Sequence, residues 1–273
     1  IASCNGTTAL MMINYCLGLQ PGDEVIVPNY TMIATPNSVL AAGATPVFVD
    51  VEPETLCMDL EAARRAVTPR TRAILYVAAN GRYPVAGIAA LRDFATAQGL
   101  ALIEDACQAL GSWYAPDQHM GTVGLAAAFS FSVPKVITTG QGGAVVTNDD
   151  AFAAKLRRVK DFGRSGGGND IHGSIGYNFK FTEMQAVIGL EQMKKLAGRV
   201  ERKKAILRRY QELLAPVIAD LYQPISIIGH DIHITASIGG ILMPRDGNTS
   251  GDLLRRAHLL MHFPSRHLRR RLP

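Results

Sequence analysis

Several kinds of residue are scarce in this chain of 273 residues, and each scarcity excludes a class of protein. Aromatic residues make up only 7%, with a single tryptophan, and they are not interleaved with the basic residues that give the net charge of +5. Modules that bind single-stranded nucleic acid need that combination of stacking rings and positive charge. No apolar run reaches the roughly 18 residues of a membrane-spanning helix. We therefore expect neither nucleic acid nor a membrane as a partner.

Cysteine is scarce as well. The four cysteines are Cys4, Cys16, Cys57 and Cys107. No two of them form a C-x-x-C pair, which argues against a disulfide framework and against a zinc site. They are typical of free thiols in a cytosolic protein, so we predict a cytoplasmic location and no metal ion. The chain begins without an initiator methionine or a signal peptide, which is typical of an internal fragment.

One lysine stands out in the middle of the chain. The apolar run 125–131 is typical of a buried strand, and Lys135 follows it as the only charged residue between Met120 and Asp149. Lys135 could simply extend from the strand end into solvent. Alternatively, it could be a nucleophile whose amine loses its proton in a desolvated site and attacks an aldehyde. The rest of the chain decides between these readings.

Strands and helices alternate over the first 150 residues. Short apolar runs bounded by turn residues predict strands at 25–28, 45–51, 73–79, 100–105 and 144–147. Longer periodic segments predict helices at 9–17, 30–42, 60–67, 88–98 and 152–161. This alternation is typical of an α/β domain with a mostly parallel, doubly wound sheet and helices on both faces.

Three features of the kind that bind ligands fall at one edge of that predicted sheet. Ligands of such sheets bind outside the carboxyl ends of the strands. Asp105 ends one predicted strand, and the turn 130–135 follows another. The loop 6–8 precedes a helix that Thr7 or Thr8 would cap, and the amino end of a helix attracts phosphate.

The second half of the chain is predicted to be more helical. The glycine-rich segment 163–176 is predicted as a mobile loop, and a helix opens at Thr182. Four apolar side chains of that helix are expected to face inward: Met184, Val187, Ile188 and Met193. An amphipathic helix at about 200–214, a strand at about 232–243 and a helix at about 253–261 follow.

Six motifs, which occur in the same order as in one known family, cover residues 5–10, 21–28, 43–50, 103–111, 129–143 and 176–186. The most distinctive read NGTTAL, IEDACQALG, FSFSVPKVITTGQGG and GYNFKFTEMQA. Over roughly residues 1–215, the chain resembles the DegT/DnrJ/EryC1/StrS sugar aminotransferases, fold-type-I enzymes that use pyridoxal 5'-phosphate (PLP). The resemblance implies a PLP-binding large domain over residues 1–198. It also implies a connecting helix and a truncated small α+β domain over residues 199–273.

The resemblance also implies a role for each site residue. Lys135 would bond to the cofactor aldehyde and then carry the proton that moves during transamination. Asp105 would pair with the pyridine nitrogen and keep it protonated. Gln108 would lie beside the ring oxygen, and Met32 would cover the ring face, where the family often has an aromatic residue. The residues implied at the phosphate are Gly6, Thr7, Thr8 and Ser130, with Asn178 reaching the phosphate of a neighbouring subunit.

The implied substrates are a nucleotide-linked keto-sugar and an amino-acid donor, glutamate, in surface polysaccharide or glycoside biosynthesis. The implied assembly is a homodimer with shared active sites. Two alternatives stay open. Family members that dehydrate the sugar keep the cofactor but carry histidine in place of the lysine, so Lys135 argues against that reaction. The other alternative is a truncated, non-catalytic remnant of the family.

Overall fold

The computed structural model of the chain describes residues 1–166, 170–221, 225–227 and 230–232. The chain divides into two compact units, Ile1–Val200 and Glu201–Pro273. The helix predicted at 253–261, and all but the first residue of the strand predicted at 232–243, lie outside the described residues. Among the helices that are described, none combines the length and the apolar character needed to cross a bilayer.

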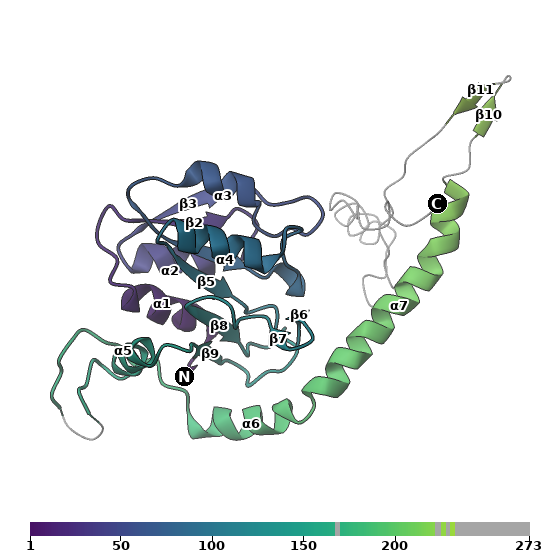
Figure 1. The fold of residues 1–273 in the computed structure, drawn as a ribbon. Helices are drawn as coiled ribbons and strands as arrows, with labels where there is room; N and C mark the ends of the chain where they lie inside the picture. The colour runs from purple at the N-terminus through teal and green to yellow at the C-terminus, as the bar shows by residue number, and fades with distance from the viewer. Residues whose placement is uncertain (167–169, 222–224, 228–229, 233–273) are drawn as a thin grey trace, which may run out of the picture. The chain divides into compact units, whose positions relative to one another are not determined.

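A seven-stranded sheet organises the first unit (Figure 1). Its strands are β1 (Ala2–Ser3), β2 (Glu24–Pro28), β3 (Thr45–Val49), β4 (Thr71–Val77), β5 (Ala101–Asp105), β8 (Ala126–Ser130) and β9 (Gly143–Val146). Across the sheet they run in the order β1-β9-β8-β5-β4-β2-β3. The neighbours from β3 to β8 pair in parallel, whereas β9 and β1 pair antiparallel. The predicted α/β class with a mostly parallel sheet is therefore confirmed.

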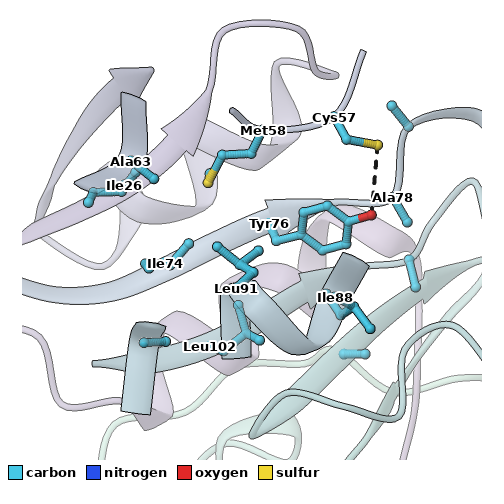
Figure 2. Close-up of a cluster of buried hydrophobic side chains, with 14 of the residues drawn as sticks. Ile26, Cys57, Met58, Ala63, Ile74, Tyr76, Ala78, Ile88, Leu91 and Leu102 are labelled. Atoms are coloured by element: carbon cyan, nitrogen blue, oxygen red, sulfur yellow. Dashed lines mark hydrogen bonds between the residues drawn. The ribbon is translucent and has the colours of Figure 1, made fainter. Parts of the chain in front are cut away.

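Helices cover both faces of this sheet. One face carries α1 (Gly6–Cys16), α2 (Ala34–Ala41) and α5 (Asp150–Lys160), and the other carries α3 (Leu60–Ala66) and α4 (Gly87–Ala97). Successive side chains of a strand point to opposite faces of the sheet, so each apolar run contributes side chains to the hydrophobic core on either face. Ile74 and Tyr76 pack with Leu91 on the side of α3 and α4 (Figure 2), whereas Leu75 joins the core on the other side.

Helix α2 begins at Ala34, four residues later than the predicted start at residue 30. Pro36 explains the difference. Proline lacks a backbone N–H and clashes with the carbonyl four residues earlier, so it is tolerated only in the first turn of a helix. A helix beginning at residue 30 would place Pro36 in the interior, whereas a start at Ala34 places it in the first turn.

Two helices follow the sheet, α6 (Glu183–Met193) and α7 (Leu196–Leu221). Thr182 caps α6 through a reciprocal pair of hydrogen bonds with Gln185, as expected for a helix that opens there. The inward orientation predicted for the apolar side chains of α6 is wrong. Within the described residues no part of α6 is buried, and Met184 is 77% exposed. The apolar periodicity is present, but no described element covers it.

Short elements were not evident in the sequence. The strands β6 (Trp113–Ala115) and β7 (Gln118–His119) form one hairpin, and β10 (Ile225–Ile227) and β11 (His230–Ile232) form another. The 3₁₀ helix η1 (Ala79–Gly81) follows β4 and holds Asn80 in the left-handed region, with a φ of 54°. Such elements are too short to show a hydrophobic period.

Candidate functional site

The candidate site lies where the carboxyl ends of β5 and β8 meet the amino end of α1. Gly6 marks this meeting point, because a Cβ atom added to it would lie 2.8 Å from the Cβ of Ser130 and 3.1 Å from the Sγ of Cys107. The first approach is closer than real Cβ contacts allow, and the second is tighter than most of them. Two segments that lie more than 100 residues later in the sequence therefore converge on this small residue.

The amino end of α1 is arranged differently from the prediction. Asn5, rather than Thr7 or Thr8, caps the helix: its Oδ1 accepts from the Thr8 N–H at 2.9 Å, and the Thr8 hydroxyl accepts from the Asn5 N–H at 3.2 Å. The N–H groups of Gly6 and Thr7 open the helix and have no acceptor within it. Together with the helix dipole, they offer a site for an anion.

Other segments fix this loop from outside. The N–H of Cys4 donates to the carbonyl of Phe179 at 3.0 Å. Gly143 lies so close that an added Cβ would be 2.4 Å from the carbonyl oxygen of Asn5. Thr7 is exposed, Thr8 is half-buried and Ser130 is buried, with its hydroxyl donating to Ser132 at 3.2 Å. The anion end of the site is therefore held by contacts with the 177–181 segment and with β9.

Asp105 ends β5 with its side chain buried, 5% exposed. Its two carboxylate oxygens accept from neutral donors: Oδ2 from the Thr35 hydroxyl at 2.7 Å, and Oδ1 from the Cys107 N–H at 3.1 Å. In the part of the chain that the structure describes, Asp105 forms no ion pair. Buried carboxylates are normally paired with a cation. The negative charge of Asp105 is thus available to a cationic group of a ligand.

Lys135 lies in the turn after β8, half-buried, with its N–H donating to the carbonyl of Ser132 at 3.0 Å. The positive charge of Lys135 acts on the neighbouring Cys107. Burial, and next the proximity of Asp105, raise the pKa of the Cys107 thiol well above its usual value, and the charge of Lys135 opposes this shift. Lys135, Cys107 and Asp105 therefore share one electrostatic environment.

The remaining predicted residues are more dispersed. Gln108 accepts from the Asn80 N–H through its Oε1 at 2.9 Å, which leaves its amide NH₂ as a donor for an oxygen-bearing ligand. Met32 is 66% exposed, between β2 and α2. Asn178 is also exposed, and its backbone forms an isolated bridge with Asp161. The cofactor roles of these three side chains stay predictions.

Together these residues fit PLP. A phosphate group needs the free N–H groups at the start of α1 and the space that glycine leaves at position 6. A protonated pyridine nitrogen needs a buried carboxylate without another cationic partner, which Asp105 provides. An aldehyde needs an amine nearby, which Lys135 provides. The donor set and the small-residue cradle therefore match the cofactor at both of its ends.

Two buried residues near the site were missed or undervalued in the sequence. Thr35, which contacts Asp105, lies in the segment 30–42 that the sequence predicts as a helix, and no role in the site was predicted for it. Glu104 is fully buried, and its carboxylate accepts four hydrogen bonds from Tyr114 and from the loop 121–124. Its place beside Asp105 in a β-strand puts it on the opposite face of the sheet. For Thr35, the only signal in the sequence was its four-residue spacing from Thr31.

Comparison with known proteins agrees with the geometry. The model of the DegT/DnrJ/EryC1/StrS aminotransferase family matches residues 1–245. The GDP-perosamine synthase of Caulobacter vibrioides is 39% identical over 215 residues, which are 79% of this chain and 57% of that protein. The chain thus spans little more than half the length of this relative.

Two solved structures share the fold. The crystal structure of DesV from S. venezuelae, in complex with a ketimine intermediate, superposes with a TM-score of 0.74 at 37% identity, covering 79% of this chain and 57% of that one. The structure of NtdA from Bacillus subtilis, with the cofactor PMP bound, gives a TM-score of 0.74 at 33% identity, covering 83% of this chain and 51% of that one. Cofactor-bearing relatives therefore have the same arrangement of elements.

Proposed function

The chain belongs to the DegT/DnrJ/EryC1/StrS aminotransferase family, and from that premise we propose that it is the cofactor-binding part of a PLP-dependent sugar aminotransferase. One observation carries the proposal. The buried carboxylate of Asp105, the amine of Lys135 and the open amino end of α1 lie at the same edge of the sheet. These three groups match the ring nitrogen, the aldehyde and the phosphate of PLP.

Each residue has a task in this reaction. PLP, when bound, supplies an electron sink beside the amino-bearing carbon. The Asp105 carboxylate holds the proton on the pyridine nitrogen, and the N–H groups of Gly6 and Thr7 orient the phosphate. The Nζ of Lys135 takes the proton from the amino-bearing carbon of the donor and later gives one to the acceptor carbon. Ser130 and Thr8 complete the phosphate end, while Gln108 and Met32 contact the ring.

The substrate class follows from the relatives. Their name, GDP-perosamine synthase, designates an amino sugar linked to a nucleotide. We propose that the acceptor is a nucleotide-linked keto-sugar, that glutamate is the amino donor and that the product enters polysaccharide or glycoside synthesis. The four cysteines are free thiols in the structure, which supports a cytoplasmic location, where thiols stay reduced.

The proposed assembly is a homodimer with shared sites. The exposed apolar side chains of α6 support it, since a surface of this kind commonly marks a protein interface. The exposed position of Asn178, on the segment that contacts the anion loop, leaves its carboxamide accessible to a second subunit.

Borohydride reduction tests the cofactor site directly. The protein is incubated with PLP, reduced and mapped by peptide mass spectrometry. A phosphopyridoxyl group is expected on Lys135, and Lys135→Ala is expected to lose it. Lys155→Ala, a change at an exposed lysine of α5, is the matched control and should keep the adduct. A folded wild-type protein without an adduct on Lys135 would overturn the proposal in favour of a non-catalytic family member.

Mixing two variants tests the shared site. At limiting PLP, Lys135→Ala forms no reducible adduct and Asn178→Ala is expected to form little. In a random mixture half of the dimers are mixed, and each of those has one intact site, so about a quarter of the wild-type adduct should return. No gain on mixing, with dimers present by sedimentation, would contradict sharing through Asn178.

A further inference from the structure

We propose that Thr35 is a positioning residue whose hydroxyl group orients the Asp105 carboxylate toward the pyridine nitrogen of the cofactor. The inference rests on the proposed function, because it assigns to Thr35 a task that acts on the ligand only through Asp105. It comes from a series of hydroxyl groups that leads from half-buried Thr31, just before α2, through buried Thr35 to the end of β5. Among the described residues, Asp105 at the end of this series forms no ion pair.

The contact itself is short and buried. The Oγ1 of Thr35 lies 2.7 Å from the Oδ2 of Asp105, and Thr35 is fully buried. Hydrogen bonds to a charged acceptor are stronger than those between neutral groups. A buried carboxylate that lost this donor would lose a large part of its compensation for desolvation.

The donor-to-acceptor order of these hydrogen bonds follows from the number of hydroxyl protons. Thr35 has one hydroxyl proton, and it is donated to Asp105. The 2.7 Å contact between the hydroxyl groups of Thr31 and Thr35 must then have Thr31 as the donor. The order Thr31 to Thr35 to Asp105 aligns two hydroxyl dipoles toward the carboxylate, and aligned hydrogen bonds strengthen one another.

The backbone of Thr35 is also held in place. The Ser38 hydroxyl donates to the Thr35 carbonyl at 2.7 Å, and the Nδ2 of Asn14 donates to the Ser38 hydroxyl at 2.9 Å. All of these residues are fully buried. Helix α1, which carries the anion end of the site, is thereby connected to the residue that orients Asp105. The pyridine end and the phosphate end are set by one network.

The network leaves room for the ligand on Asp105. A carboxylate offers about four acceptor positions. Thr35 occupies one position on Oδ2, and the Cys107 N–H occupies one on Oδ1. With one donor on each oxygen, the plane of the carboxylate is fixed while further lone pairs stay open for a pyridine N–H.

A matched set of threonine variants tests the assignment. Thr35→Val removes the hydroxyl at nearly constant shape, and Thr35→Ser restores it. Thr55→Val is the control: Thr55 is also a buried threonine that donates to a carboxylate at 2.7 Å, that of Glu52. Thr35→Val is expected to weaken PLP binding by about tenfold, equivalent to about 1.4 kcal/mol, whereas Thr35→Ser stays within about threefold and Thr55→Val leaves binding unchanged.

A second readout separates orientation from general loss of structure. The nitrogen-15 resonance of ring-labelled PLP reports whether the pyridine nitrogen is protonated. The protonated signal is expected in the wild type, in Thr35→Ser and in Thr55→Val, and is expected to be diminished in Thr35→Val. Binding and resonance that are unchanged in Thr35→Val would overturn the inference alone. A wild-type protein that forms no adduct on Lys135 would instead overturn the proposed function.

Discussion

The two edges of the central sheet each bury a carboxylate, and they treat it in opposite ways. At the amino edge, Glu24 begins β2 with 6% exposure and accepts from the Thr68 hydroxyl and from the guanidinium of Arg70. At the carboxyl edge, Asp105 ends β5 with 5% exposure and accepts from a hydroxyl and a backbone N–H, with no ion pair among the described residues. The two residues are about equally buried, but among the described residues only Glu24 is paired with a cationic side chain of the protein.

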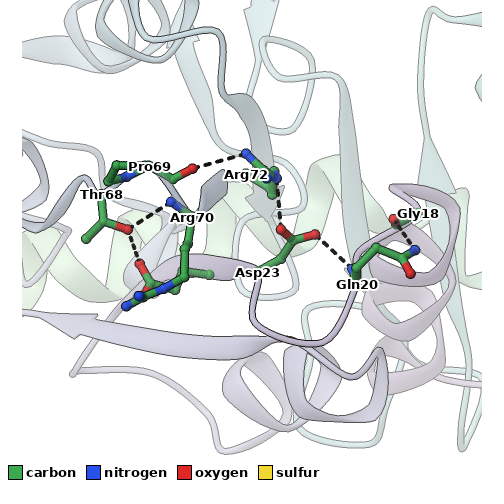
Figure 3. A network of polar contacts seen from close by, with 8 residues as sticks. Gly18, Gln20, Asp23, Thr68, Pro69, Arg70 and Arg72 are labelled. Atoms are coloured by element: carbon green, nitrogen blue, oxygen red, sulfur yellow. Dashed lines mark hydrogen bonds and ion pairs between the residues drawn. The ribbon is translucent and has the colours of Figure 1, made fainter.

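The difference separates a structural edge from a ligand-binding edge. The neighbouring Asp23 is also paired, with the Nε of Arg72 at 2.9 Å, so the charges shown in Figure 3 neutralise each other. Such a network leaves no charge for a ligand. At the other edge, neutral donors hold the carboxylate in place without cancelling its charge. A buried acid that lacks a cation, rather than burial itself, identifies the binding edge.

Replacing Asp105 should produce the largest effect. Asp105→Asn removes the charge that holds the pyridinium, so PLP binding is expected to weaken by about 100-fold, since a hydrogen bond to a charged group contributes up to about 3 kcal/mol. Absorbance titration measures the affinity, and urea unfolding of the cofactor-free protein should show a change within about 1 kcal/mol. If Asp105→Asn bound PLP with unchanged affinity, the proposed difference between a structural edge and a ligand-binding edge would be wrong.

Glu104 offers an intermediate case, because it is a buried carboxylate beside Asp105 that is fully used by the protein. Glu104→Gln replaces one acceptor oxygen by an NH₂ group that faces N–H and O–H donors, and is expected to lower the free energy of unfolding by about 2 kcal/mol. Urea unfolding is the measurement. Glu61→Gln, at an exposed ion pair with Arg64, should change stability by less than about 0.5 kcal/mol. Equal effects from both variants would contradict this role.

Glu24 should give the smallest effect, and one that depends on pH. The Thr68 hydroxyl and then Arg70 lower the pKa of Glu24 below its ordinary value of 4.5. A lowered pKa means that the carboxylate stabilises the fold above pH 4.5 and loses this contribution as the pH falls through the folded-state value. Arg70 is 67% exposed, so the pair is screened and Glu24→Gln should cost only about 1 kcal/mol at pH 7.

Unfolding curves of the wild type and Glu24→Gln between pH 7 and pH 3 measure this effect. The two stabilities should converge at the acid end, with PLP binding at pH 7 equal in both proteins. A gap that widens toward low pH would show that the sign is wrong.

Most of the sheet could be predicted because its strands are short apolar runs separated by proline and glycine turns. The run at 73–79 and the strand β4 (Thr71–Val77) differ by two residues at each end. The start of α2 was misplaced because Pro36 restricts where a helix can begin. The helix α6 shows a different limit, since its period predicts a buried face and no described segment covers that face.

The site also contains residues that could be predicted from the sequence and residues that could not. Lys135 and Asp105 were visible because a charge next to an apolar run is conspicuous. Thr35 was not visible, because its task depends on a contact with a residue 70 positions away. Asn5 caps the helix, whereas Thr7 or Thr8 was predicted to do so. Asparagine is preferred over threonine at this position, but three capping-type residues in a row left the sequence ambiguous.

The connection between the anion loop and distant residues has a consequence for biosynthesis. Strand β1 precedes that loop and, within the described residues, pairs with β9, about 140 residues later, and the Cys4 N–H donates to the carbonyl of Phe179. A chain emerging from the ribosome can fold β2 to β5 from neighbouring segments, whereas long-range pairings form late. The loop that would bind phosphate is therefore synthesised well before the residues that secure it. Any nascent chain that stops short of residue 179 carries the phosphate motif without the support that positions it.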